Sequence, residues 1–237
     1  MKRTATDEPY VSMCLIVRNA EKPIVKCPDG QELPSLEACL QSVRARLPQA
    51  EIVIVHTGGS TDRTEEIALK YADVYEVTKG PRGDWDDKMY AFDDAAWARQ
   101  RSFELASGRW RGWIDADDRL AGPEEAEKLL KLNGVWKPTV NQVVEEPKEF
   151  QGAPQSLEDI LHFVEKNVPK VDAIWCPYLY QREPNGNAVT WQSRERFVLW
   201  DKDKPKYAWK EAAHEVLVPV DGHAAGRLDL AHLLYVH

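Results

Sequence analysis

The chain has 237 residues, and its 31 basic and 39 acidic side chains give a formal net charge of −8. This length suits one large α/β domain or two small ones with a substantial core. The negative charge disfavours a broad nucleic-acid-binding surface, although a local basic groove remains compatible with it. The start of the chain lacks the apolar stretch of a signal peptide, and no apolar run reaches the length of a membrane span. The sequence therefore predicts a cytoplasmic protein without a membrane span.

The cysteines Cys14, Cys27, Cys39 and Cys176 show neither CxxC spacing nor a neighbouring histidine. Cys14 and Cys176 lie within apolar runs. We therefore expect buried free thiols in a reducing compartment.

The first part of the chain alternates strand and helix patterns. Residues 10–17 (YVSMCLIV) predict a buried strand, and a polar loop follows over 18–32. Residues 34–47 carry one apolar stripe at helical spacing. Residues 51–55 (EIVIV) form a continuous apolar strand, which is typical of a parallel sheet covered on both faces. The alternation predicts an α/β fold.

The second strand leads into the segment HTGGSTDRTEEIALKYA, residues 56–72. Its two glycines allow a tight turn, and Ser60 or Asp62 is suited to cap the next helix, with Glu65 in capping-box position to Asp62. Such a turn can present backbone N–H groups to a nucleotide. The spacings of a dinucleotide fingerprint and of a P-loop are absent. A plain βα turn is the alternative interpretation.

A third strand over residues 73–78 precedes a long irregular segment, residues 79–94. Loops of that length tend to be functional or mobile. Residues 95–107 predict a helix that ends at Gly108. Arg99 and Arg101 on this helix are expected near the carboxyl edge of the sheet.

The segment RWRGWIDADDRL, residues 109–120, places Asp115, Asp117 and Asp118 just past the end of a predicted strand. Ligands bind at this edge of open α/β sheets. Crowded carboxylates repel one another unless a cation is present, so the cluster indicates half of a Mg²⁺ or Mn²⁺ site, completed by waters and a substrate diphosphate. The alternative is a solvated acidic turn that caps the helix beginning at Pro123.

The remaining chain changes character. Residues 133–154 predict a loop, and 156–168 predict a helix with Asp159 in capping-box position. Two β-rich arms then surround a hairpin signal at 184–186, followed by short strands. We therefore expect a single domain, 1–237, made of an α/β part over residues 9–133, an insertion over 134–170 and a β-rich part over 171–237.

Four segments occur in a recognisable order: LIVRNAEK, EIVIVHTGGSTDRTEEIA, ARQRSFELASGRWRGWIDADD and WKEAAHE. This order resembles the family-2 glycosyltransferases with the A-type nucleotide-sugar fold. Their patterns run I-V-[KR]-N-E, V-D-x-G-S-T-D-x-T, A-R-N before G-D-W and D-A-D-D, and W-x-G-x-x-H-E. The resemblance covers residues 10–120 and 194–217. It implies a Rossmann-like mixed sheet flanked by helices, with a β-rich C-terminal part on the acceptor side.

The resemblance also implies roles for single residues. Asp117, and Asp115 partly through the ribose, would hold Mn²⁺ or Mg²⁺ on the donor diphosphate, and His214 would close the metal site. Glu215 is the first candidate for the catalytic base and Glu211 the second, while Asp117 acts in catalysis through the metal. The expected donor-binding residues are Val17, Arg18, His56, Thr57, Gly58, Asp62, Arg99, Asp115 and Ala116.

The expected activity is metal-dependent, inverting transfer from a nucleotide sugar, with a UDP-sugar as the expected donor. The acceptor stays open among a saccharide, a protein, a lipid and a modified nucleic-acid base. Residues 79–94, with Trp85, would form a lid that excludes water.

Two alternatives stay open. A metal-dependent nucleotidyltransferase would share the sheet and the acidic cluster, but it usually has a Gly-rich segment after the first strand, where this chain has none. A catalytically silent nucleotide-sugar or partner-binding module is favoured by one departure from the family pattern: His56 or Thr57 replaces the Asp that usually reads uracil.

Overall fold

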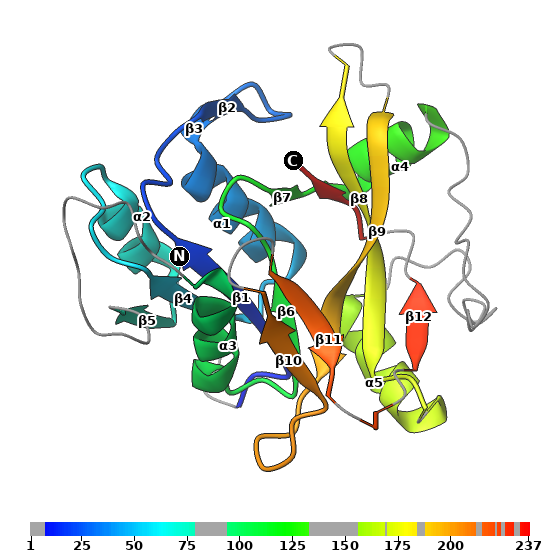
Figure 1. Ribbon diagram of the computed structural model, residues 1–237. Helices are drawn as coiled ribbons and strands as arrows, with labels where there is room; N and C mark the ends of the chain where they lie inside the picture. The colour runs from blue at the N-terminus through cyan, green and yellow to red at the C-terminus, as the bar shows by residue number, and fades with distance from the viewer. Residues whose placement is uncertain are drawn as a thin grey trace.

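The computed structural model in Figure 1 describes residues 8–78, 94–132, 156–168, 170–183, 188–211, 215–220, 222–223, 226–229 and 233–237. Several predictions fall outside these residues: most of the lid with Trp85, the 133–154 loop, the Asn-Gly hairpin tip and the candidate metal ligand His214. They stay predictions.

A nine-stranded mixed sheet forms the centre of the described molecule (Figure 1). Its path begins with four strands that are mutually parallel: β5 (Val74–Val77), β4 (Glu51–His56), β1 (Val11–Val17) and β6 (Trp110–Trp113). It continues through the antiparallel β9 (Ala188–Leu199), then β8 (Ala173–Arg182), β13 (Tyr235–Val236) and β7 (Arg119–Leu120), while β12 (Arg227–Asp229) pairs with β8. The predicted α/β class with a β-rich C-terminal part is confirmed.

Helices cover the two faces of this sheet. The helices α1 (Ser35–Arg46), α2 (Thr64–Tyr71) and α5 (Leu157–Asn167) supply apolar side chains to the main core cluster. The opposite face carries α3 (Ala95–Leu105) and the hairpin of β10 (Tyr207–Lys210) and β11 (Val216–Pro219), which share a second cluster. Helix α4 (Pro123–Leu132) follows β7. Among the described residues, no helix combines the length and apolar character needed to cross a membrane.

The strand order reverses at the junction between β1 and β6. The chain moves from β1 outward through β4 to β5 and then returns to β6 on the other side of β1. Loops that leave two adjacent parallel strands in opposite directions open a crevice at their carboxyl ends, where α/β folds bind ligands. Arg18 and Ile114 follow the two strands at this point.

The polar loop predicted over residues 18–32 contains regular structure, which corrects that expectation. The short strands β2 (Ile24–Lys26) and β3 (Glu32–Pro34) form an antiparallel hairpin. Three-residue strands carry too little alternation to be distinguished from a loop. The hairpin leads directly into α1 and stands above it in Figure 1.

The role predicted for Gly108 is also corrected. Helix α3 ends at Leu105, before this glycine, and Gly108 has no positive φ. A Cβ at this position would lie 2.5 Å from Ser12 Oγ and 2.6 Å from the Ser12 backbone nitrogen. Gly108 is therefore required by the close approach of the chain to β1, not as a left-handed helix cap.

The described cysteines are all free thiols, as expected. Cys14, Cys39 and Cys176 are buried, whereas Cys27 is only partly buried. Burial raises the pKa of the Cys14 thiol to about 12, which keeps it protonated and unreactive at neutral pH.

Candidate active site

The turn after β4 is bound to the loop after β1 through a set of short hydrogen bonds. The Thr57 backbone N–H donates to the Val17 carbonyl at 3.1 Å, and the Asn19 N–H donates to Ser60 Oγ at 2.9 Å. Gly58 and Gly59 both have positive φ, 74° and 64°, which only glycine adopts without strain. The two segments that the sequence predicted for the donor pocket therefore form one rigid edge.

Arg18 and Asp62 lie in this edge. A Cβ added at Gly59 would lie 3.3 Å from Arg18 Nη2, so the guanidinium rests against the turn. Asp62 accepts from the Glu21 N–H at 3.0 Å and from the Thr64 N–H at 3.1 Å. Burial raises the pKa of Asp62, but the hydrogen bond from the Thr64 hydroxyl and those from the two backbone N–H groups outweigh it, and the net shift is downward.

The predicted capping of the next helix is confirmed in part, because the Asp62 side chain accepts the N–H of Thr64, the first helical residue. Helix α2 begins at Thr64, and its N-cap residue Arg63 makes no side-chain cap bond. Asp62 also ties the turn to the loop after β1 through the Glu21 N–H, and beside it the Ala20 N–H donates to Thr64 Oγ1 at 2.7 Å. The residue predicted as a local cap therefore makes a long-range contact as well.

His56 ends β4 with its ring held between two hydroxyl groups. Its Nε2 lies 2.7 Å from Ser60 Oγ, and its Nδ1 lies 2.9 Å from the Tyr75 hydroxyl. Burial lowers the pKa of His56, so the ring is neutral at pH 7. The structure brings His56 to the edge of the predicted donor pocket, with both ring nitrogens already bonded inside the protein.

Arg99 connects two carboxylates from distant parts of the chain. It projects from α3, its side chain is 2% exposed, and its guanidinium pairs with Asp115. Its Nε donates to Glu215 Oε1 at 3.1 Å, and Nη1 donates to the Ile114 carbonyl at 3.3 Å. The rings of Trp113 and Trp209 pack around the cation.

The contact between Arg99 and Asp115 determines the charge states of both side chains. Burial alone raises the pKa of Asp115, but the nearby Arg99 charge outweighs it and lowers that pKa below its ordinary value. Burial likewise lowers the pKa of Arg99, but the charges of Asp115 and Glu215 outweigh it and the net shift is upward. Both groups are therefore ionised at neutral pH.

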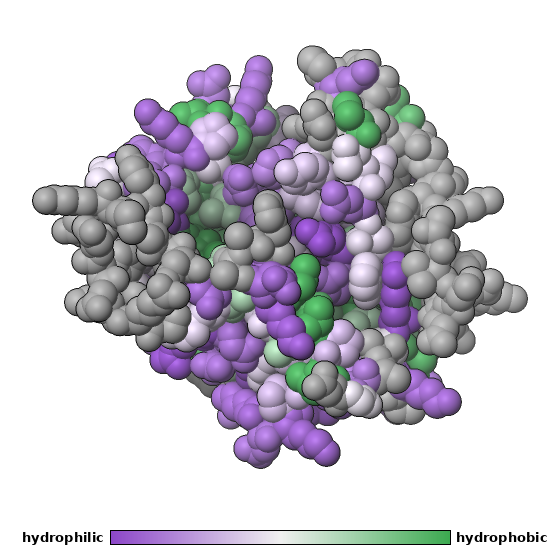
Figure 2. Space-filling model, viewed as in Figure 1, coloured by the Kyte–Doolittle hydropathy of each residue, from purple (hydrophilic) through white to green (hydrophobic). Residues whose placement is uncertain are grey.

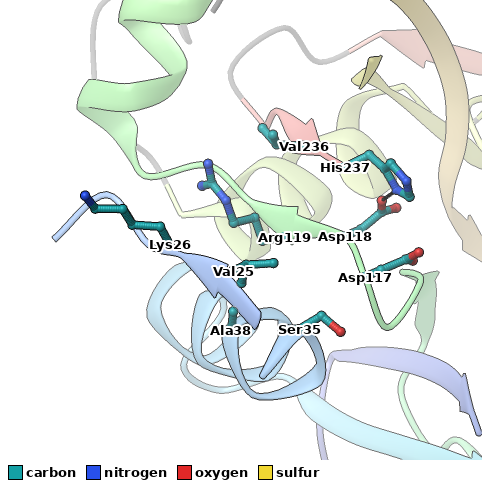
Figure 3. Close-up of a pocket in the computed structure, with 9 residues that line it drawn as sticks. All are labelled: Val25, Lys26, Ser35, Ala38, Asp117, Asp118, Arg119, Val236 and His237. Atoms are coloured by element: carbon teal, nitrogen blue, oxygen red, sulfur yellow. Dashed lines mark hydrogen bonds and ion pairs between the residues drawn. The ribbon is translucent and has the colours of Figure 1, made fainter. Parts of the chain in front are cut away.

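A second group of side chains lies beside this pair. Asp117, Asp118 and His237 place one ligand atom each within 4.8 Å of one another, an arrangement that can hold a metal ion. They line a pocket of about 290 Å³ together with residues of β2, α1 and β7, among them Val25, Ser35 and Arg119 (Figure 3). Figure 3 shows the Asp118 carboxylate meeting the His237 imidazole, with Asp117 next to them.

The pKa of Asp117 is raised, because surrounding protein displaces water and because Asp118 and Asp115 repel its negative charge, although His237 attracts it. The Asp118 hydrogen bond, followed by the charge of Asp117, raises the pKa of His237 against the effect of burial. A divalent cation bound beside Asp117 would offset the repulsion that this carboxylate experiences from Asp118 and Asp115.

The predicted metal ligands are thus only partly brought together. Asp117 lies in the group, Asp115 is bonded to Arg99, and His214 lies outside the described residues. Ala116 packs against the main core between the two aspartates. Of the candidate bases, Glu215 is bound to Arg99, whereas Glu211 is exposed and has a φ of 68°.

Three residues of this site were missed by sequence reasoning: His237, Tyr178 and Arg196. Tyr178 donates to Asp118 Oδ1 at 2.8 Å, and Arg196 pairs with Asp118 Oδ2 at 3.4 Å. They come from β8 and β9, and His237 follows β13. The only local signal was the set of polar residues inside otherwise β-forming stretches.

Comparison with known proteins agrees with this geometry. Residues 31–134 match the family model for glycosyl transferase family 2. This match spans less than half of the 237-residue chain. The matched segment runs from β3 to the end of α4 and so includes the turn after β4, Arg99 and the aspartate cluster. No curated protein sequence is significantly similar to the chain.

Solved structures with some likeness to this chain include the 1–349 fragment of S. aureus TarS, with 16% identity over 76% of this chain and a TM-score of 0.38. The same fragment in complex with UDP-GlcNAc has 17% identity over 76% of this chain and a TM-score of 0.37. The bifunctional IspDF from Campylobacter jejuni has 10% identity over 81% of this chain and a TM-score of 0.35. The matches cover 38%, 36% and 41% of those chains. At these scores the structural likenesses carry no argument about function.

Proposed function

We propose that the protein transfers a sugar from a nucleotide-sugar donor, with a UDP-sugar as the expected donor, and that the reaction depends on a metal ion and inverts the anomeric centre. The observation that supports this most is the place of the acidic group. Asp115 and Asp117 follow β6 at the switch point, at the same sheet edge as the rigid turn after β4. Asp117, Asp118 and His237 gather there around a pocket.

The donor set fits a divalent cation. Carboxylate oxygens suit Mg²⁺ and Mn²⁺, whereas an imidazole ligand is tolerated better by Mn²⁺ than by Mg²⁺, which prefers oxygen ligands alone. We therefore favour Mn²⁺, held by Asp117 and His237. Such an ion stabilises the negative charge that develops on a leaving diphosphate.

Each remaining part of the site has a proposed role. The backbone edge formed by Val17, Thr57 and Gly58, with Arg18 against it, would bind the nucleoside. Asp115, kept ionised and oriented by Arg99, would accept hydrogen bonds from the ribose. These contacts would hold the donor with its diphosphate over the end of β6. Holding the reacting groups in a fixed orientation lowers the entropic part of the reaction barrier.

Glu215 is our candidate for the base that takes the proton from the acceptor nucleophile. Its bond to the buried Arg99 fixes the position of its carboxylate, as a base requires. Glu211 is the second candidate, since it is exposed near the same hairpin. The acceptor remains open among a saccharide, a protein, a lipid and a modified nucleic-acid base.

A thermal-shift panel tests the proposal. Uridine, guanosine and adenosine diphosphate sugars would be added with and without Mn²⁺, because a ligand at 100 times its Kd stabilises the folded state by about 2.7 kcal/mol. We expect one nucleotide to raise the Tm, and the Mn²⁺-dependent part of the rise to disappear in Asp117→Asn. A matched control is Asp29→Asn, a change in the β2–β3 hairpin turn. A full metal-dependent Tm shift in Asp117→Asn would show that Asp117 does not bind the metal.

Product analysis separates the alternatives. Release of a nucleoside diphosphate with a sugar of inverted configuration supports the transferase, and release of pyrophosphate from a nucleoside triphosphate supports a nucleotidyltransferase. Binding without turnover would support the silent module, which the buried and fully bonded His56 in place of a uracil-reading aspartate also favours.

A further inference from the structure

We propose that Asp118 is a positioning residue, not a metal ligand: its carboxylate fixes the tautomer and the direction of the His237 ring so that Nε2 is the nitrogen offered to the cation. This rests on the proposed function, because it assigns a role within the proposed cation site. The rival assignment is that Asp118 and His237 Nδ1 both bind the ion directly, since these groups lie close together.

The first argument is that the Asp118 carboxylate is buried and that both of its oxygens already have hydrogen-bond partners in the protein. Its side chain is 0% exposed, whereas that of His237 is 39% exposed. Oδ1 accepts from the Tyr178 hydroxyl at 2.8 Å and lies 3.0 Å from His237 Nδ1. Oδ2 accepts from Arg196 Nη2 at 3.4 Å. A carboxylate with protein donors on both oxygens is better placed to orient a ligand than to become one.

The second argument is that Arg196 is itself immobile. Its side chain is 0% exposed, and its guanidinium carbon lies 4.0 Å from the Trp113 ring centroid, 4.5 Å from that of Tyr178 and 4.2 Å from that of Tyr235. This aromatic cage holds a permanent positive charge next to Asp118. The positive charge of Arg196 would repel a metal cation bound to the same carboxylate.

The third argument concerns the ring. A carboxylate that accepts the Nδ1–H bond fixes the Nδ1–H tautomer of a neutral imidazole and leaves the lone pair on Nε2. The Tyr180 ring stacks on His237 with centroids 5.1 Å apart and an interplanar angle of 27°, which restricts rotation. Asp118 and Tyr180 together therefore hold the ring, and Asp117 and Nε2 remain as the accessible donors.

The substitution Asp118→Asn gives a sharp test because Arg196 can only donate hydrogen bonds. The amide oxygen of the new side chain must face Arg196, so its NH₂ group faces His237 Nδ1. That nitrogen then has to accept, and the proton moves to Nε2. The variant should reverse the tautomer and remove the nitrogen lone pair from the cation site, whereas Tyr178→Phe should leave the tautomer unchanged.

Nitrogen-15 NMR of the metal-free protein above pH 8 reads the tautomer directly. We expect Nδ1–H in the wild type and Nε2–H in Asp118→Asn. A wild-type protein with Nε2–H overturns the inference without any variant, and so does an Asp118→Asn variant that folds and keeps Nδ1–H. Neither result depends on whether the protein binds a metal, so this part stands apart from the proposed function.

Addition of Zn²⁺ as a diamagnetic probe then identifies the ligand nitrogen. Coordination of Nε2 is expected, and coordination of Nδ1 overturns the inference. No shift of either nitrogen, with the tautomer behaviour as expected, would count against the cation site of the proposed function and leave the positioning contact intact.

A double-mutant cycle of Mn²⁺ affinity, measured by electron paramagnetic resonance, completes the test. We expect Asp118→Asn and His237→Ala each to weaken binding by about 10- to 100-fold. Adding Asp118→Asn to His237→Ala should change the affinity by less than about threefold, because Asp118 acts through the ring. A further loss as large as that of the single variant would show direct ligation and overturn the proposal.

Discussion

Arg99 is the residue on which the two proposed functional carboxylates depend. Its guanidinium is buried and pairs with Asp115 and Glu215, which lie far apart in the sequence. Arg99→Met would keep the volume of the side chain and leave both carboxylates without a partner. We expect a loss of at least about 2 kcal/mol in the free energy of unfolding, below the value for a fully buried pair because the Asp115 side chain is 35% exposed.

Urea unfolding followed by tryptophan fluorescence measures this loss. Glu215→Gln is the matched control, because it keeps a hydrogen-bond acceptor for Arg99 Nε and should cost less than half as much. Equal stability of Arg99→Met and the wild type would mean that the ion pairs add nothing to folding, and Arg99 would then be retained for donor binding alone.

At the same scale, the sequence predicted residues that act close to their own motif. Asp117 and Asp115 after β6, and Val17 and Thr57 at the ends of β1 and β4, lie at the predicted sheet edge. The partners of Asp118 could not be predicted, because Tyr178, Arg196 and His237 reach it only through the pairing of strands that are far apart in the chain. A single histidine carries no spacing pattern that assigns it to a site.

At the scale of elements, the connection from α3 to β6 depends on Gly108. A Cβ there would lie within 2.8 Å of three atoms of Val11 and Ser12 in β1. Because two of these are backbone atoms that cannot rotate away, Gly108→Ala should move the connection and cost about 1–3 kcal/mol of stability. Gly122→Ala is the matched control, since a Cβ at Gly122 meets nothing within 4 Å.

Chemical denaturation of the two variants decides the point. We expect Gly108→Ala to lower the midpoint and Gly122→Ala to leave it within experimental error of the wild type. Equal midpoints for both variants would show that the connection can shift at no cost.

The strands β1, β4 and β6 were predictable because nearly all of their residues are buried, as in β4, where all six are. The short strands β2 and β3 were not, because three residues carry too little pattern. Gly108 shows a different limit: a glycine after a helix predicts a cap, but only the packing against Ser12 shows why this position excludes a side chain. The mixed pairing of β9, β8, β13 and β7 likewise depends on contacts between distant segments.

At the scale of the whole molecule, the surface shown in Figure 2 is mostly hydrophilic. Two ion pairs link outer elements to the sheet. Glu76 of β5 accepts from Arg101 of α3 through two bonds of 2.8 Å, and Glu165 of α5 pairs with Arg109 beside β6 and accepts from the Tyr10 hydroxyl at 2.8 Å. The hydrogen bond from the arginine is the main reason why the pKa of each glutamate is lowered, despite burial.

A carboxyl whose pKa is lower in the folded state than in the unfolded state stabilises the fold above the unfolded value, here 4.5, and this stability is lost as the pH falls through the folded value. We therefore expect the Tm to be nearly constant from pH 7 to about 5.5 and to fall as the pH drops to 4 and below. Because these pairs are partly exposed, each should contribute no more than about 1 kcal/mol.

The double variant Glu76→Gln, Glu165→Gln separates these pairs from general acid unfolding. It should have a slightly lower Tm than the wild type at pH 7 and a smaller decrease toward pH 4, because neither site then takes up a proton on unfolding. Salt at about 1 M should reduce the difference at pH 7 by screening the exposed charges. Differential scanning calorimetry at four pH values measures both curves. Parallel curves for the two proteins would place the acid sensitivity elsewhere, with Asp115 and its bond to Arg99 as the next pair to test.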